Sequence, residues 1–171
     1  GVILVAGAGN SNVDITKFSF LPAGYDNVIA VAATDSSDRR AGFSCYGSSV
    51  DVAAPGVDIL SLRANNTNMY EDEVHIVDEI YYVASGTSMA CPHVAGLSAL
   101  ILSKNPDLNF EQLRTVLRSS TDKINSSVYA GVGRINAHKA LQKSYPVIVS
   151  LNSSLDILEL KGSIDIKGTI I

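Results

Sequence analysis

The sequence has little of what marks several classes of protein. Its 171 residues include only two cysteines and no run of about 20 apolar residues of the kind that spans a bilayer. Its 13 Lys and Arg residues are scattered and the net charge is −4, so long-range attraction to phosphate backbones or anionic lipid is weak. We therefore expect no membrane span, no nucleic-acid partner and no disulfide framework, with Cys45 and Cys91 as two buried thiols rather than one bridge.

The overall composition of the sequence is typical of one folded domain. Apolar residues make up 46% of the chain and charged residues 18%, which is enough to bury a core. Short apolar runs bounded by turn residues come first, and longer helical patterns follow. Strands are predicted at 2–5, 27–34, 50–56 and, more weakly, 57–60; helices are predicted at 88–104, 109–121 and 135–143. This order favours an α/β domain with a mostly parallel sheet.

Two of these elements carry further expectations about burial. The run Val2 to Val5 is apolar without alternation, which predicts a central strand covered on both faces, with sheet neighbours upstream of Gly1. We therefore interpret the chain as a fragment of a longer protein. The helix at 88–104 is apolar nearly all round, which predicts burial in the centre of the domain. Asn109, with Gln112 three residues later, predicts a capping box at the next helix.

Two segments depart from the α/β pattern. Residues 63–82 are rich in carboxylates and suggest a solvated acidic excursion with a short hairpin around "VHIV" and "IYYV". A metal site there is the alternative, but the spacing matches no ligand pattern. Residues 146–171 alternate apolar and polar positions, which predicts the opening strands of an antiparallel β module after a first domain at 1–145.

A serine stands where the apolar helix is expected to begin, within "ASGTSMACPHVAGLSALIL" (84–102). Free backbone N–H groups and the helix dipole favour negative charge at such a position, which suits a catalytic Ser88. Gly86 would allow a substrate backbone to approach closely. From the residues alone, an ordinary helix cap at "SGTS" is the commoner interpretation.

A family resemblance favours the catalytic interpretation. The segment "GTSMACPHVAG" (86–96) resembles the nucleophile motif of the subtilisin-like serine proteases, including Pro92 inside the helix. Further segments resemble that family in the same order: "VAGAGN" (5–10), residues 27–61 and "GVGRINAHKAL" (131–141). The resemblance implies the C-terminal half of a three-layer subtilisin-like fold over residues 1–145.

The resemblance also implies the chemistry. Ser88 would be the nucleophile of a serine endopeptidase that forms an acyl-enzyme, and the side chain of Asn10 would be one donor of the oxyanion hole. The backbone N–H of Ser88 would be the second donor, and Thr87 would support it. The expected partner is a peptide or protein substrate, and the expected location is outside the cell.

The chain departs from the family pattern in one respect. The family orders its triad Asp, His, Ser, and no segment here resembles the Asp or His motif, so we expect both upstream, together with the rest of the domain. None of the three histidines is expected to replace them: His93 lies five residues past Ser88 on one helix, His75 lies in the acidic excursion, and His138 lies on the last helix. The isolated chain is therefore expected to be inactive.

Two alternatives to a protease remain open at this stage. The missing residues are those that a pseudoenzyme or an interaction domain of the same family would lose. A nucleotide-binding module is suggested by "GAGN" after a strand, but Asn12 stands where the third glycine of that fingerprint belongs. Reading the upstream polypeptide for the Asp and His would separate the first alternative from a protease.

The resemblance further implies a weak cation site. Its ligands would be the main-chain carbonyls of Ala23, Tyr25 and Val28 and the carboxylate of Asp51, with calcium or sodium as the ion. The alternative is that Asp51 caps a turn and no ion binds.

Overall fold

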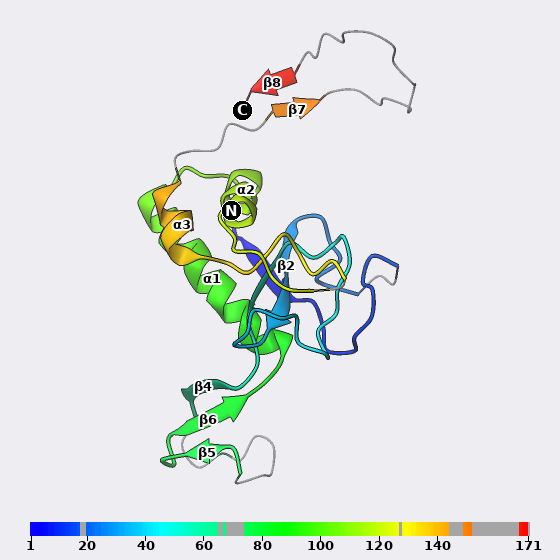
Figure 1. Ribbon diagram of the computed structural model, residues 1–171. Helices are drawn as coiled ribbons and strands as arrows, with labels where there is room; N and C mark the ends of the chain where they lie inside the picture. The colour runs from blue at the N-terminus through cyan, green and yellow to red at the C-terminus, as the bar shows by residue number, and fades with distance from the viewer. Residues whose placement is uncertain are drawn as a thin grey trace.

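The computed structural model describes residues 1–17, 20–64, 67, 74–126, 128–143, 149–151 and 168–170 (Figure 1). The three strands at the centre form one parallel sheet in the order β1-β2-β3. Their bounds are β1 Leu4–Gly7, β2 Val28–Thr34 and β3 Val52–Pro55. The predicted α/β class and the first three predicted strands are confirmed.

Strand β2 is the centre of this sheet. All seven of its residues are buried, and its register places Ala30 beside Ala6 of β1 and Ala32 beside Ala53 of β3. The prediction that the first strand is central, with sheet neighbours upstream of Gly1, concerns polypeptide outside this chain and stays a prediction. Strand β1 lies at the sheet edge, and Val2 before it and Leu4 within it are 85% and 49% exposed.

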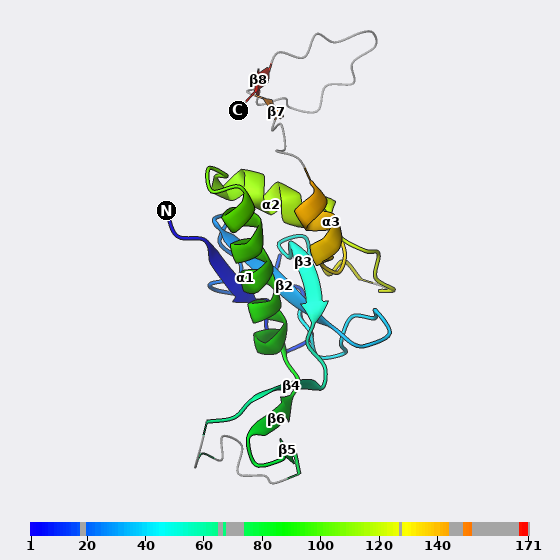
Figure 2. The same cartoon turned by 90° about the vertical axis from the view of Figure 1, so that its left-hand side faces the viewer.

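Three helices pack against this sheet. They are α1 Thr87–Lys104, α2 Phe110–Ser119 and α3 Ala137–Gln142. Figure 2 shows α1 running along one face of the three strands, with α2 and α3 beside its C-terminal half. Apolar side chains of β2 and β3, among them Ile29, Val31 and Val52, join those of α1 and α2 in one buried cluster. This burial is what holds α1 against the sheet.

Helix α1 is covered on one face only. Its buried residues are Thr87, Ala90, Val94, Leu97, Ser98 and Ile101. The opposite face carries Pro92, Ala95, Gly96 and Ala99, which are all exposed. The expectation of a helix buried all round is therefore corrected. Within the described part of the chain, no other element covers this second face of α1.

The other face of the sheet is covered by loops. Ile15, Ala23, Cys45, Val50 and Ala130 form a second buried cluster with the small residues of β1 and β2. Cys45 is buried and Cys91 is partly buried, and both are free thiols, as predicted.

A second, antiparallel sheet occupies part of the acidic excursion. It contains β4 Ile59–Leu62, β6 Tyr81–Ala84 and β5 Ile76–Val77, in the order β4-β6-β5. The predicted hairpin is present, but the weak fourth strand pairs with β6 and not with the parallel sheet. Figure 1 shows this sheet projecting beyond the N-terminal end of α1, away from α2 and α3.

The capping box predicted for α2 is present. The Asn109 side chain accepts the N–H of Gln112, and the Gln112 side chain accepts the N–H of Asn109.

Helix α2 also presents two arginines to a buried carboxylate. Asp51, which is 1% exposed, accepts from Arg114 Nε at 2.7 Å and Arg118 Nη1 at 2.8 Å. These ion pairs fasten α2 to the start of β3.

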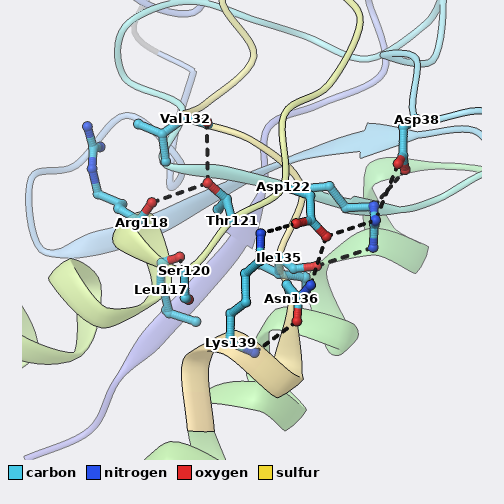
Figure 3. A network of polar contacts seen from close by, with 11 residues as sticks. Asp38, Leu117, Arg118, Ser120, Thr121, Asp122, Val132, Ile135, Asn136 and Lys139 are labelled. Atoms are coloured by element: carbon cyan, nitrogen blue, oxygen red, sulfur yellow. Dashed lines mark hydrogen bonds and ion pairs between the residues drawn. The ribbon is translucent and has the colours of Figure 1, made fainter. Parts of the chain in front are cut away.

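A second polar network fastens α3 (Figure 3). The carboxylate of Asp122 accepts from Asn136 Nδ2 at 2.8 Å, from Arg134 Nη2 at 3.2 Å and from Lys139. Arg134 also pairs with Asp38, which brings the turn after β2 into the network. The hydrogen bonds from Lys139 and Asn136, together with the nearby charges, lower the pKa of Asp122.

Two short strands, β7 Val149–Leu151 and β8 Gly168–Ile170, form an antiparallel pair. The other residues of the predicted β module lie outside the described residues, so the division at residue 145 stays a prediction. None of the helices in the described residues is long and apolar enough to cross a bilayer.

The Asp51 ion pairs generate a stability prediction. Replacing Asp51→Ala leaves two guanidinium groups facing each other without their shared carboxylate, so we expect the free energy of unfolding to fall by about 3 kcal/mol. Arg39→Ala breaks an exposed ion pair with Asp35 and should cost less than about 1 kcal/mol. Urea denaturation measures both, and equal losses would contradict the assignment.

The Asp122 network generates a pH prediction. Because its folded-state pKa is lowered, the ionised carboxylate stabilises the fold above its unfolded pKa of about 3.9, and this stabilisation is lost as the pH falls through the folded pKa. The difference in unfolding free energy between wild type and Asp122→Asn should be constant from pH 7 to about 5 and should shrink below about pH 4. Asp107→Asn, which removes an exposed carboxylate without an ion pair in the described part, is the control for the loss of one surface charge.

Candidate active site

The candidate site lies at the carboxyl edge of the parallel sheet, where ligands of α/β proteins commonly bind. Asn10 comes three residues after the end of β1, and Ser88 is the second residue of α1. A hydrogen bond of 2.7 Å from Gly86 N–H to the carbonyl of Gly56 fixes the start of α1 against the end of β3. The fold thus brings together two residues that are far apart in the sequence.

Thr87 connects the two halves of the site. Its backbone N–H and its hydroxyl both donate to Asn10 Oδ1, at 2.9 and 3.0 Å. The Thr87 hydroxyl in turn accepts the N–H of Gly9 at 3.1 Å. Because the carbonyl oxygen of the Asn10 amide is held by two donors, its NH₂ group is directed away from Thr87 and is free to donate elsewhere.

Gly86 leaves a small space beside two hydrogen-bond donors, the Asn10 side-chain amide and the backbone N–H of Ser88. A Cβ atom at Gly86 would lie 3.3 Å from Asn10 Nδ2 and 3.7 Å from the backbone nitrogen of Ser88. Both donors therefore border the volume that the missing side chain leaves empty. An oxygen that develops negative charge in this space can accept a hydrogen bond from each of them.

Two glycines next to Asn10 have no room for a side chain, and one of them allows β1 to approach α1 this closely. A Cβ at Gly7 would lie 2.9 Å from both the carbonyl and the hydroxyl oxygens of Thr87. Gly9 has a φ of +106°, and a Cβ there would collide with Phe20. The glycines that suggested a nucleotide fingerprint thus serve the packing of this site. The role of Gly7 was not predicted, because the contact joins segments 80 residues apart.

The hydroxyl of Ser88 is exposed and has no hydrogen-bond partner among the described residues. Each of the three histidines contacts another group of the described chain. His93 Nδ1 is 2.9 Å from the carbonyl of Met89, His138 contacts Gln142, and the His75 ring packs beside Tyr82. That no histidine of this chain supplies the base stays a prediction.

Cys91 lies one turn after Ser88 but does not resemble a nucleophile. Its thiol donates to the carbonyl of Val5 at 3.4 Å, and burial raises its pKa. A thiol with a raised pKa holds less thiolate at neutral pH, which lowers its reactivity. Cys91 instead ties α1 to the edge strand β1.

The predicted cation ligands do not fit an ion at Asp51. Its Oδ1 accepts from two arginines, and its Oδ2 accepts the N–H of Ala30 at 3.0 Å. Arg114 also donates to the carbonyl of Asp26, between the predicted ligands Tyr25 and Val28. Two fixed positive charges here oppose a further cation, and the described residues contain no cluster of three Asp, Glu, His or Cys side chains that could hold a metal ion. The carbonyls of Ala23, Tyr25 and Val28 as ligands stay a prediction.

The geometry defines a class of site: a serine at a helix N-terminus whose backbone N–H and a side-chain amide border one small space. Comparison with known families then identifies the group. The chain belongs to the Subtilase family, whose model matches residues 1–140.

Individual relatives agree with this assignment. Subtilisin DY from Bacillus licheniformis is 43% identical over 143 residues, which cover 83% of this chain and 47% of that protein. A thermophilic serine proteinase from Bacillus sp. (strain AK1) is 44% identical over 142 residues, which cover 82% of this chain and 31% of that protein. The chain thus spans less than half the length of these relatives.

Solved structures share the fold. Fervidolysin from Fervidobacterium pennivorans, described as a keratinolytic enzyme related to subtilisin, matches with a TM-score of 0.71 and 36% identity. The match covers 85% of this chain and 23% of that one. The predicted family and fold class are therefore confirmed.

The space above Gly86 generates a prediction for the complete enzyme. Gly86→Ala places a methyl group between the Asn10 and Ser88 donors, so kcat should fall by about 100-fold or more, as expected when an oxyanion donor is lost. Gly42→Ala is the control, because a Cβ there meets no atom within 4 Å. Full activity of Gly86→Ala on a peptide substrate would show that the oxyanion is bound elsewhere.

Proposed function

We propose that this chain carries the nucleophile and the oxyanion hole of a serine endopeptidase. The observation that carries the proposal is the contact in which Thr87 holds Asn10 Oδ1, so that the Asn10 amide and the Ser88 N–H face one space beside the Ser88 hydroxyl. The proposed substrate is a peptide bond of a polypeptide.

The proposed reaction has two steps. A base removes the hydroxyl proton of Ser88 as its Oγ attacks the carbonyl carbon, and the carbonyl electron pair moves onto the oxygen, where Asn10 and the Ser88 N–H donate to it. The intermediate collapses, the amine leaves with the proton from the base, and Ser88 holds the acyl group. Water, deprotonated by the same base, then releases the acid and restores Ser88.

We propose that the base and its carboxylate partner belong to polypeptide upstream of this chain. Ser88 lies on the same helix face as the exposed residues Pro92, Ala95, Gly96 and Ala99, at spacings of three and four. A segment packed on that stripe would bury apolar surface and would also place its own side chains beside the Ser88 hydroxyl. Val2 and Leu4, which are exposed at the edge strand β1, add to the apolar surface on which that segment could pack.

Two further parts of the proposal follow from the family resemblance. The protein would act outside the cell, as an exported protease. The alternative function is a catalytically inactive relative or an interaction domain, in which the upstream residues are not His and Asp.

The test is covalent labelling with a fluorophosphonate, which reacts with an activated serine. We expect labelling at Ser88 when the chain is combined with its upstream polypeptide, and none in Ser88→Ala of the same complex, because only the wild type has both nucleophile and base. The chain alone should label poorly, since without the base the hydroxyl stays protonated. Mass spectrometry of the labelled peptide measures both.

The remaining outcomes contradict parts of the proposal. Rapid labelling of the chain alone would mean that a base lies within these residues. A folded complex that does not label would favour the inactive alternative.

A further inference from the structure

The antiparallel sheet β4-β6-β5 has one apolar face that is open to solvent. Its register pairs Leu60 with Val83 and Leu62 with Tyr81, and pairs Val77 with the same Tyr81. Because side chains alternate across a strand, these five residues share one face, which we call the sheet face. Leu60 is 54% exposed, Leu62 79% and Val77 37%.

The sheet that carries this face is joined directly to the candidate active site. Strand β6 ends at Ala84, and only Ser85, Gly86 and Thr87 separate it from Ser88. Ser85 is held by the N–H of Asp58, which donates to its hydroxyl at 2.9 Å, and Gly86 is held by Gly56. The sheet is therefore attached to the nucleophile through a short connection that is fixed at both strands.

The segment that contains the sheet is strongly acidic. Residues 57–85 contain six carboxylates and one arginine, although the whole chain has a net charge of only −4. Among the described residues, Asp78 and Glu79 are exposed in the turn between β5 and β6, directly beyond Val77 and Tyr81. An apolar surface thus lies between Ser88 and a negatively charged turn.

We propose that the sheet face binds the polypeptide substrate beside the scissile bond and selects apolar residues followed by a basic one. This inference rests on the proposed function. Because Asp78 and Glu79 lie beyond Tyr81, at the far end of β6 from Ser88, the basic residue would lie several positions from the scissile bond. Apolar side chains would cover Leu60, Leu62 and Val77, and a Lys or Arg would face Asp78 and Glu79.

The test compares two peptides that differ only at these positions, using the catalytically complete enzyme. One carries apolar residues and a Lys, and the other carries Ser and Glu in their place. Wild type should favour the first peptide in kcat/KM. The variant Leu62→Ser/Val77→Ser should lower that preference roughly tenfold, because it removes apolar contact, and Asp78→Asn/Glu79→Gln should remove the advantage of Lys over Glu.

A matched control separates this effect from general damage. Val132 is 38% exposed, close to the 37% of Val77, but its backbone bonds to Asp51, at the opposite edge of the parallel sheet from Ser88. Val132→Ser should leave the preference unchanged. Binding of the first peptide to Ser88→Ala, measured by fluorescence anisotropy, should weaken by a similar factor when Leu62→Ser/Val77→Ser is added.

Failure of the inference can be told apart from failure of the proposed function. If the variants cleave both peptides with the wild-type preference, the enzyme is a protease but the sheet face does not bind substrate. If Leu62→Ser/Val77→Ser lowers the melting temperature without changing the preference, another polypeptide covers the face and the inference is overturned. If no peptide is cleaved and Ser88 does not label, the proposed function itself fails.

Discussion

The contact between Thr87 and Asn10 is the constraint on which the rest of the site depends. It joins the end of an edge strand to the start of a helix that comes 77 residues later, and it fixes which atom of the Asn10 amide faces outward. Gly7 is required because a side chain there would push β1 away from Thr87, and Gly9 is required because a Cβ there would collide with Phe20. The parallel sheet supports this contact, since Ile29 and Val31 of β2 pack with α1 in one buried cluster.

The two arginines at Asp51 and the network at Asp122 have a different task. They lie toward the part of the fold where α2 and α3 pack, and they fix those helices to β3 and to the turn after β2. The stability of the helical layer and the geometry of the nucleophile thus depend on separate sets of interactions. This separation explains how Ser88 can be held rigidly at the start of α1 while its side chain stays exposed.

Local patterns were sufficient to predict most elements. The capping box at Asn109, the buried run of β2 and the hairpin around β5 and β6 each depend on neighbouring residues, so the sequence alone indicated them. The strand that pairs with β4 could not be predicted from local patterns, and neither could the exposure of β1 and α1. Both depend on which distant segment of the chain packs against these elements. The pairing of Asn10 with Ser88 came from family resemblance, since residue chemistry alone left Ser88 as either a cap or a nucleophile.

The bond between Gly86 and Gly56 has a consequence for variation in this fold. It closes the ends of the 57–85 segment against each other, and a Cβ at Gly56 would lie 2.6 Å from Ala33 and 2.8 Å from the Gly86 carbonyl. The entropy of closing a loop grows only slowly with its length. Segments of other lengths and compositions can therefore be exchanged at this junction while the helix start stays in place, which makes it a natural point for grafting new recognition surfaces.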